Sequence, residues 1–316
     1  MGISGLLPLL APIQRQVHLR DFKGLTVAVD TYVWLHRAAF GCAMDLGLNK
    51  PTTAYISFCM KRIALLKEHG ITPLLVFDGG CLPMKHHTES ERRKRRKEAR
   101  KRAHEELAKG NNAKAMEMFQ QCVDITPNMA WELMKVLRKQ GIEFIVAPYE
   151  ADAQLVYLEK IKKVDAVLTE DSDLLVFGCQ RLLLKLEASG NLIEIRAKDF
   201  PQVPCMKKGW SFAKFRQACI LSGCDYLPSL KGVGIKKAFD ALNGTSDAER
   251  VSILLTFGHS MKAPPVRDNY QAEFQEAELT FLYQRVYDPV QKALVYLNTP
   301  EGGVELIDDM SRFLGQ

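Results

Sequence analysis

Seven acidic residues of the 316-residue chain stand beside apolar, strand-like sequence or in a glycine turn. They are Asp30, Asp78, Glu150, Asp152, Asp171, Asp173 and Asp225. Four of them form two close pairs within the stretch Pro148–Gly178. Carboxylates grouped without His or Cys are typical of sites for Mg²⁺ or Mn²⁺ and not of sites for zinc.

Carboxylates that meet in one place repel one another. Two of them about 6 Å apart repel by roughly 3 kcal/mol at an effective dielectric constant near 20. An acid with three such neighbours would lose on the order of 8 kcal/mol, which rivals the whole stability of a domain, about 5–15 kcal/mol. Either several of the acids stay protonated or cations neutralise them. Two divalent ions about 3.5–4 Å apart could also activate water and stabilise the leaving oxygen of a phosphodiester.

Glu150 and Asp152 would point about 200° apart inside a regular helix. They can share a site only where a strand turns into a helix, and Pro148 indicates such a turn.

Four apolar runs predict the strands that would position these acids. The runs are Leu25–Asp30, Ile71–Asp78, Glu143–Pro148 and Asp165–Asp171. Unbroken Val, Ile and Leu indicate strands that are buried on both faces of a parallel sheet. Helical patterns alternate with them over Thr53–His69, Met129–Gln140 and Ala151–Ile161. The sequence therefore predicts an α/β fold in which helices flank a mostly parallel central sheet.

Ligands bind beyond the carboxyl ends of the strands in open sheets of this kind. The acids expected at that edge are Asp30, Asp78, Glu150 and Asp171. A lone acid there is most often a helix cap. Four acids together, two of which belong to close acidic pairs, favour a shared site.

The segment from Lys85 to Lys109 contains eleven Lys and Arg against five Glu, which equals the whole net charge of +6. A cationic element of this kind suits a polyanion, although a solvated charged helix is an open alternative. The pattern from Thr88 to Glu91 predicts a helix start with a capping box. Because no bulky apolar residue lies between Lys85 and Glu98, this helix should stand off the body. Lys85 and Arg92, seven residues apart, would face the same way and could neutralise a phosphate.

Two further helices are predicted on either side of a glycine turn, over Ser211–Ser222 and Ile235–Leu242. Gly232 and Gly234 bracket the turn, where free backbone N–H groups can hold a phosphate, and Lys236 and Lys237 add positive charge. A plain turn between helices is an equally open interpretation. A last helix is predicted over Phe274–Val286, and 291–316 carries no chemical signal.

A hydrophobic content of 47% with 25% charged residues is typical of a soluble globular protein. No apolar run approaches the length of a membrane span, and the start of the chain lacks the pattern of a signal peptide. The eight cysteines contain no C-x-x-C pair, which favours a reduced intracellular compartment over a zinc site or a disulfide framework.

Six ordered motifs between Met1 and Gly244 resemble the structure-specific 5′ nuclease superfamily: MGISGLLPLL, VAVDTYVWLH, LLVFDGG, APYEADAQL, TEDSDLLVFG and SGCDYLPSLKGVGIKKA. This superfamily contains the flap endonucleases, the xeroderma-type repair nuclease and exonuclease one. Asp152 favours the exonuclease-one branch, because flap endonucleases typically have Glu at that position. The chain also lacks a sliding-clamp peptide of the Q-x-x-[IL]-x-x-F-F type.

The resemblance implies a PIN-like 5′ nuclease fold with a helical arch and a helix–two-turn–helix element. It implies one catalytic domain over residues 1–290, followed by an extension, 291–316, that begins a longer tail. The expected parts of the domain are an N-terminal nuclease region 1–80, a basic arch 81–128, an internal nuclease region 129–208 and a helix–two-turn–helix element 209–245.

The resemblance also implies roles for individual residues. It assigns one Mg²⁺, which Mn²⁺ could replace, to Asp30, Asp78, Glu150 and Asp152, and a second to Asp171, Asp173 and Asp225. It assigns the steering of the scissile phosphate to Lys85 and Arg92. It places K⁺ or Na⁺ at Ser222, Ser229 and the carbonyl of Val233. The expected DNA contacts include those two arch residues and Gly2, Tyr32, His36, Arg93, Arg96, Gly232, Gly234, Lys236 and Lys237. Without the resemblance, Tyr32 and His36 would be interpreted as core packing or a cap.

The function that the resemblance implies is a nuclear, monomeric, Mg²⁺-dependent 5′→3′ exonuclease that also cuts 5′ flaps. Its substrate would be duplex DNA with a nick, a gap, a recessed end or a 5′ flap. Its setting would be mismatch repair, end resection and recombination, with mismatch-repair proteins bound through a tail and no membrane involved. A flap-specific endonuclease of replication is the first alternative. A non-catalytic DNA-junction binder is the second, although the presence of all seven acids argues against it.

Overall fold

A seven-stranded sheet forms the centre of the protein in a computed structural model that describes residues 2–206, 209–243, 269–300 and 311–315. The strand order is β1-β7-β6-β5-β2-β3-β4, and the five strands from β6 to β4 are parallel. The bounds are β1 Arg15–His18, β2 Thr26–Asp30, β3 Thr72–Phe77, β4 Phe144–Val146, β5 Ala166–Leu168, β6 Arg181–Leu184 and β7 Asn191–Arg196. The predicted mostly parallel sheet is confirmed.

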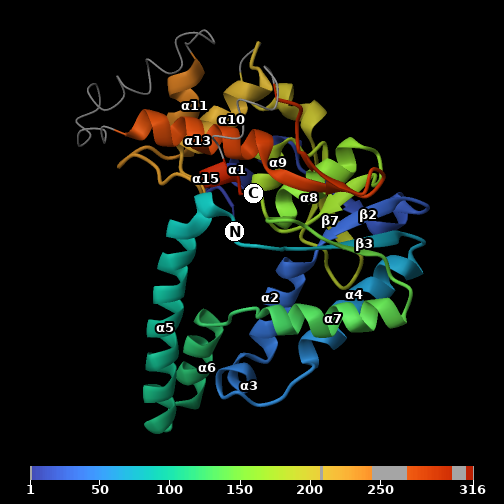
Figure 1. The fold of residues 1–316 in the computed structure, drawn as a ribbon, viewed down its shortest axis with the longest axis vertical. Helices are drawn as coiled ribbons and strands as arrows, with labels where there is room; N and C mark the ends of the chain where they lie inside the picture. The colour runs from blue at the N-terminus through green and yellow to red at the C-terminus, as the bar shows by residue number, and fades with distance from the viewer. Residues whose placement is uncertain (1, 207–208, 244–268, 301–310, 316) are drawn as a thin grey trace.

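Helices cover both faces of this sheet (Figure 1). On one face lie α2 Thr31–Gly41, α4 Ala54–Glu68 and α7 Pro127–Lys139. The other face is packed by α8 Ala151–Lys160, α9 Asp173–Phe177, α10 Phe212–Leu221, α11 Ile235–Asn243 and α13 Tyr270–Tyr283. In β2, Val27 and Val29 join the first layer of side chains while Ala28 joins the second. This alternation explains why the run reads as continuously apolar, since both faces of the strand are buried.

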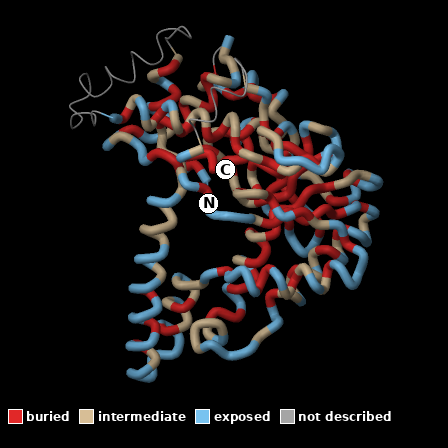
Figure 2. Tube along the Cα trace, in the orientation of Figure 1, coloured by how far each residue is buried: buried red, intermediate tan, exposed pale blue. Residues whose placement is uncertain are grey.

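The basic segment forms η3 Pro83–Lys85 and then α5 His86–Ala108, which projects from the body together with α6 Asn112–Gln121 (Figure 1). Figure 2 shows that most of α5 is not buried, as its sequence predicted. Small side chains in its last turns, Ala99 and Ala103, are buried, and Ala103 packs with α6 and α3 Ala43–Gly47.

The predicted capping box from Thr88 to Glu91 is wrong. The helix begins at His86 without a side-chain cap, and the Thr88 hydroxyl donates to the carbonyl of Asp225 at 2.7 Å. A contact across the site has replaced the local one.

Described residues after Asn269 also pack against the domain. The helix predicted over Phe274–Val286 ends at Tyr283, because the following residues form strand β8 Arg285–Asp288, which pairs with β9 Ala293–Tyr296. The predicted boundary at residue 290 falls in the turn of this hairpin and therefore marks no domain end. A four-residue helix, α15 Ser311–Leu314, packs against α13 and η3.

The remaining elements are α1 Leu6–Leu9, η1 Ala11–Ile13, η2 Leu19–Phe22 and η4 Ala197–Gln202. The last two residues of the predicted span 209–245, the last two of 129–208, and residues 301–310 and 316 lie outside the described residues. Within the described ranges, no helix has both the length and the apolar character needed to cross a membrane.

Candidate active site

The predicted acids meet at the carboxyl edge of the sheet. Asp30 ends β2, and three other acids follow β3, β4 and β5. A cavity of about 350 Å³ is lined by Asp30, Asp78, Glu150, Asp152, Asp171 and Asp225. Asp173 lies beside it and accepts a hydrogen bond from the backbone N–H of Ile3 at 2.9 Å. Glu150 is the N-cap residue of α8 and Asp152 lies in the first turn of this helix. Both residues therefore stand at the predicted strand-to-helix turn.

Local hydrogen bonds hold several of these carboxylates in place. Asp30 caps α2 by accepting from the N–H of Val33 at 3.3 Å, while its other oxygen accepts from the Thr169 hydroxyl at 2.8 Å. Asp78 accepts from the N–H of Ala151 at 2.7 Å. The alternative that such an acid is a helix cap is therefore correct for Asp30, yet the same side chain lines the cavity.

The pKa values of these acids show the expected crowding. Burial raises the pKa of Asp30 to about 7, and the charge of Asp78 adds to the effect. Burial raises the pKa of Asp78 to about 6. Burial, followed by the charge of Asp171, holds the pKa values of Asp152 and Asp173 well above the usual range. A bound cation would offset both the desolvation cost of the buried charges and the repulsion between them, so these carboxylates fit a hard divalent ion.

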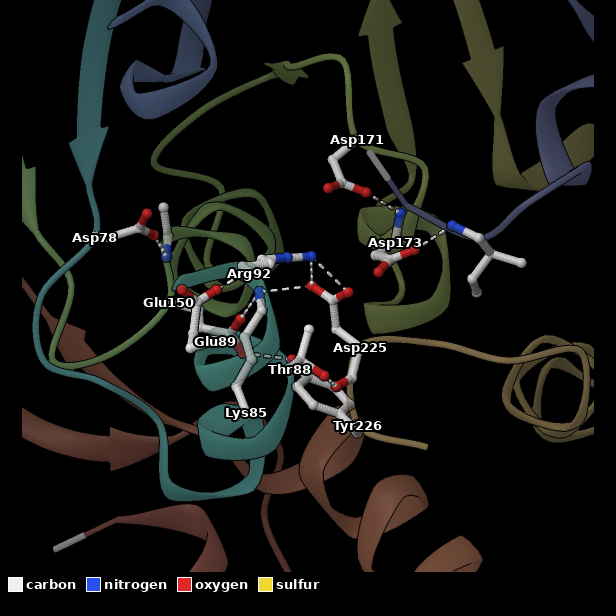
Figure 3. Close-up of polar contacts among 12 residues, drawn as sticks. Asp78, Lys85, Thr88, Glu89, Arg92, Glu150, Asp171, Asp173, Asp225 and Tyr226 are labelled. Carbon is white, nitrogen blue, oxygen red and sulfur yellow. Dashed lines mark hydrogen bonds and ion pairs between the residues drawn. The ribbon is translucent and has the colours of Figure 1, made fainter. Parts of the chain in front are cut away.

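Two positively charged side chains of the arch, Lys85 and Arg92, line the cavity (Figure 3). The Lys85 ammonium lies 2.5 Å from Oε1 of Glu150 and 2.9 Å from Oδ2 of Asp225. The Arg92 guanidinium donates to both oxygens of Asp225 at 2.8 and 2.9 Å. The two side chains converge as their spacing predicted, although Lys85 belongs to η3 and not to the helix itself.

These contacts set the charge state of the partners. Burial acts to lower the pKa of Lys85, but Glu150 and Asp225 raise it well above 10.5. Burial acts to raise the pKa of Asp225, but Lys85 and Arg92 bring it below its usual value.

Among the described side chains, no three His, Cys, Asp or Glu already stand close enough together to ligate one ion. Glu150 and Asp225 instead face Lys85. The residue types and their shared cavity fit the predicted metal ions, and their assignment to individual ions stays a prediction.

The start of the chain lies against the second acidic pair. A Cβ atom on Gly2 would stand 2.4 Å from both Oδ1 of Asp171 and the Ser172 hydroxyl, and its φ is +95°. Only glycine fits there without strain. The predicted proximity of Gly2 to the site is observed, whereas its contact with DNA is a prediction.

The cavity also includes Tyr32, His36 and Arg96, which were predicted as DNA contacts. Burial raises the pKa of Tyr32 to about 12 and lowers that of His36. Arg96 lies 3.6 Å from Asp124 and 3.9 Å from Glu89. Arg93, by contrast, is exposed on the arch and does not line the cavity.

The two helices predicted around the glycine turn are α10 and α11. Ser222 donates its hydroxyl hydrogen bond to the carbonyl of Cys219 at 2.7 Å, and Gly223, with φ +98°, brings the chain back against Ser229. Val233 is buried, and Gly232 adopts φ +81°. The positive φ values of Gly223 and Gly232 thus favour glycine at these two positions, while the predicted phosphate and cation ligands of the turn stay predictions. Gly234 and the lysines Lys236 and Lys237 are exposed there.

Three residues of the site were not found by sequence reasoning. Thr169 bridges Asp30 and the N–H of Asp171 through its hydroxyl. Tyr226 and Gln284 both donate to Oε2 of Glu150. Tyr226 directly follows Asp225 and could have been suspected, whereas Gln284 lies in the predicted helix Phe274–Val286, to which no chemical role was assigned.

Comparison with known proteins gives two family matches, and the matched segments contain the predicted acids. The XPG N-terminal domain matches residues 1–99 and the XPG I-region matches residues 141–225. Exodeoxyribonuclease 1 of Schizosaccharomyces pombe is 43% identical over 309 residues, which are 98% of this chain and 54% of that protein. DNA damage-inducible protein DIN7 of Saccharomyces cerevisiae is 42% identical over 306 residues, which are 94% of this chain and 69% of that protein.

Solved structures share the fold. The catalytic core of Rad2 in complex with DNA substrate (complex IV) has a TM-score of 0.69 at 20% identity, covering 100% of this chain and 96% of that one. The Holliday junction-resolving enzyme GEN1 in complex with product DNA and Mg²⁺ has a TM-score of 0.60 at 21% identity, covering 92% of this chain and 66% of that one. The chain spans about half or less of the length of several curated relatives, 54% in Schizosaccharomyces pombe and 40% in Arabidopsis thaliana.

Proposed function

Because this chain belongs to the structure-specific 5′ nuclease superfamily, we propose that it hydrolyses phosphodiesters at the 5′ ends of duplex DNA. It would act as a Mg²⁺-dependent 5′→3′ exonuclease that also cuts 5′ flaps. One observation carries this proposal: Asp30 and Asp78, whose pKa values are raised, share a cavity with Lys85 and Arg92 of the arch.

Asp30, Asp78, Glu150 and Asp152 would hold one Mg²⁺, and Asp171, Asp173 and Asp225 would hold the second. When bound, these ions supply positive charge and an activated water for in-line attack on the phosphate. GEN1, which shares the fold, has been solved in complex with product DNA and Mg²⁺, which supports this choice of metal.

Lys85 and Arg92 supply the charge that the protein itself brings to the reaction. Both side chains now neutralise carboxylates of the cavity. A phosphate that enters offers each of them a second anionic partner at the same place. Arg presents a planar fork suited to a phosphate, and Lys presents a compact charge, so they would stabilise charge that grows on the scissile group.

The other predicted contacts would position the duplex. Tyr32, His36 and Arg96 line the cavity on the side of α2 and α5, where the nicked end would lie. The turn between α10 and α11, with Gly232, Gly234, Lys236 and Lys237, would hold a phosphate of the duplex some distance from the cut. Ser222, Ser229 and the carbonyl of Val233 would bind K⁺ or Na⁺ there.

We place this activity in nuclear DNA repair, on duplexes with nicks, gaps, recessed ends or 5′ flaps. The names of two relatives, an exodeoxyribonuclease and a DNA damage-inducible protein, support this setting. Action as a monomer and binding of mismatch-repair proteins through a tail belong to the same proposal.

Product analysis on end-labelled nicked DNA with Mg²⁺ tests the proposal. We expect mononucleotides that retain the 5′ phosphate, and a rate on nicked duplex comparable to that on a long 5′ flap. Asp171→Ala and Asp173→Ala should each abolish cleavage while duplex binding persists. Unchanged cleavage in both variants would refute the metal assignment, and a strong preference for the flap would favour the flap-specific alternative.

A further inference from the structure

The two carboxylate oxygens of Glu150 have different partners. Oε1 faces the ammonium of Lys85 at 2.5 Å. Oε2 accepts one hydrogen bond from the hydroxyl of Tyr226 and another from Nε2 of Gln284 at 2.9 Å. Nε2 of Gln284 also lies 2.9 Å from the Tyr226 hydroxyl oxygen, so that the three groups close a triangle.

This triangle is buried. Gln284 is fully buried, and Glu150 and Tyr226 are each 8% exposed. The amide of Gln284 has one productive orientation, because rotating it would set its carbonyl oxygen against the carboxylate.

We propose that Tyr226 and Gln284 are positioning residues that occupy Oε2 of Glu150 and leave Oε1 as the single oxygen presented to a metal ion. Glu150 would therefore bind the ion through one oxygen only. This inference rests on the proposed function, in which Glu150 is a metal ligand. Mg²⁺ requires nearly ideal octahedral geometry, so fixing which oxygen points at it matters for affinity.

The surrounding structure keeps both donors in register with Glu150. Gln284 immediately precedes β8, and the β8–β9 hairpin is joined to α8 by Gln154. This side chain donates to the carbonyl of Tyr287 at 2.8 Å and accepts from its N–H at 2.7 Å. The ring of Tyr226 packs edge-on against Phe281, with ring centroids 4.9 Å apart. Gln284 is thus next to a strand tied to α8, which begins directly after Glu150, and Tyr226 packs against α13, which ends directly before Gln284.

Tyr226 also follows Asp225 in the chain, and Asp225 shares Lys85 with Glu150. The Tyr226 hydrogen bond therefore ties the predicted ligand of one ion to the backbone that holds a predicted ligand of the other. Substitution of Tyr226 should weaken the binding of both ions, whereas substitution of Gln284 should weaken chiefly the binding of the ion at Glu150.

The test uses Tyr226→Phe and Gln284→Met, which keep the packing volume of the side chains. Mn²⁺ binding to the DNA-free protein is followed by electron paramagnetic resonance, and the Mg²⁺ concentration for half-maximal cleavage is measured separately. Loss of a group that orients a metal ligand typically weakens metal binding 10–100-fold. We expect a weakening of about that size in both measurements, with unchanged duplex binding in EDTA. The double variant should be weakened by less than the product of the single effects, because both donors act on one oxygen.

Tyr157→Phe is the matched control. Tyr157 is 7% exposed, lies on α8, and donates to the carboxylate of Asp288 at 2.8 Å without touching Glu150. It loses the same kind of buried hydrogen bond as Tyr226→Phe and should keep the metal affinity of the unsubstituted protein. Unchanged Mn²⁺ binding in folded Tyr226→Phe and Gln284→Met, or an equal loss in Tyr157→Phe, would overturn the positioning role. Unchanged cleavage in both Asp171→Ala and Asp173→Ala would instead refute the metal assignment of the proposed function.

Discussion

Replacing Asp30 by Asn should stabilise the metal-free protein while it removes a proposed metal ligand. Asp30 is buried, and its pKa rises from 3.8 to about 7 because of burial and the nearby charge of Asp78. A folded pKa above the unfolded one means that the stability contributed by this group is fully present below about pH 4. That stability is lost as the pH rises through about 7.

The magnitude follows from the size of the rise. Each tenfold change in proton affinity corresponds to about 1.4 kcal/mol, so the ionised carboxylate costs the metal-free protein about 4 kcal/mol at pH 8. Asn carries no charge but keeps one carbonyl oxygen for the hydrogen bonds that Val33 and Thr169 now donate to two oxygens. Allowing for one weakened hydrogen bond, at about 1–2 kcal/mol, Asp30→Asn should gain roughly 2 kcal/mol at pH 8. For a chain of this size that is a rise in Tm on the order of 4 °C.

Thermal unfolding in EDTA at pH 5 and pH 8 measures the effect. The advantage of Asp30→Asn should be largest at pH 8 and should shrink at pH 5, where the aspartate is protonated. Saturating Mg²⁺ should narrow the gap at pH 8, because the ion stabilises the unsubstituted protein. Asp199→Asn is the control, since Asp199 is equally buried but pairs with Arg15 at 2.8 Å and should lose stability. A lower Tm for Asp30→Asn at pH 8 in EDTA, or a gap that does not change with pH, would refute the reasoning.

Two other predictions concern the arch. Arg92→Ala should slow single-turnover cleavage by roughly 10²–10³-fold while duplex affinity changes much less, because Arg92 would act mainly on charge that develops in the transition state; a rise in KM alone would show that it only holds DNA. Phe313→Ala should remove a buried ring that packs with Met84 beside Lys85, lower stability by roughly 3 kcal/mol and reduce kcat. Phe40→Ala, which changes an exposed phenylalanine, is its control in the same unfolding and cleavage assays. Equal kcat values for the two variants would show that α15 does not influence the arch.

The sequence predicted the elements that obey local rules. Unbroken apolar runs gave the strands, and the absence of apolar residues after Lys85 gave a helix that stands off the body. The convergence of Asp30, Asp78 and Asp171 followed from the rule that parallel strands end at one edge. These predictions needed only periodicity and the position of each acid in its run.

The two errors arose where another contact replaced the one that the local pattern predicted. Thr88 was expected to cap its own helix, yet its hydroxyl donates to Asp225, which is 137 residues away. The helix predicted to reach Val286 ends at Tyr283, because the following residues pair with β9 instead of continuing the helical turn. A local pattern cannot predict the distant partner of Thr88, whereas the β8–β9 hairpin is a local feature that the helical interpretation missed.

Gln284 shows the same limit within the site itself. Its amide reaches Glu150 across 134 residues, and it is fully buried although Gln is usually exposed. Burying an amide is costly where one of its atoms lacks a hydrogen bond; here Nε2 donates two hydrogen bonds, to Glu150 and Tyr226, while the buried Oε1 of Gln284 accepts none. The predicted acids therefore identify where metal ions would bind, while the orientation of at least one ligand is decided by an uncharged side chain near the end of the chain. Lys85 faces the other oxygen, Oε1, so the arch and Gln284 act on different oxygens of one carboxylate.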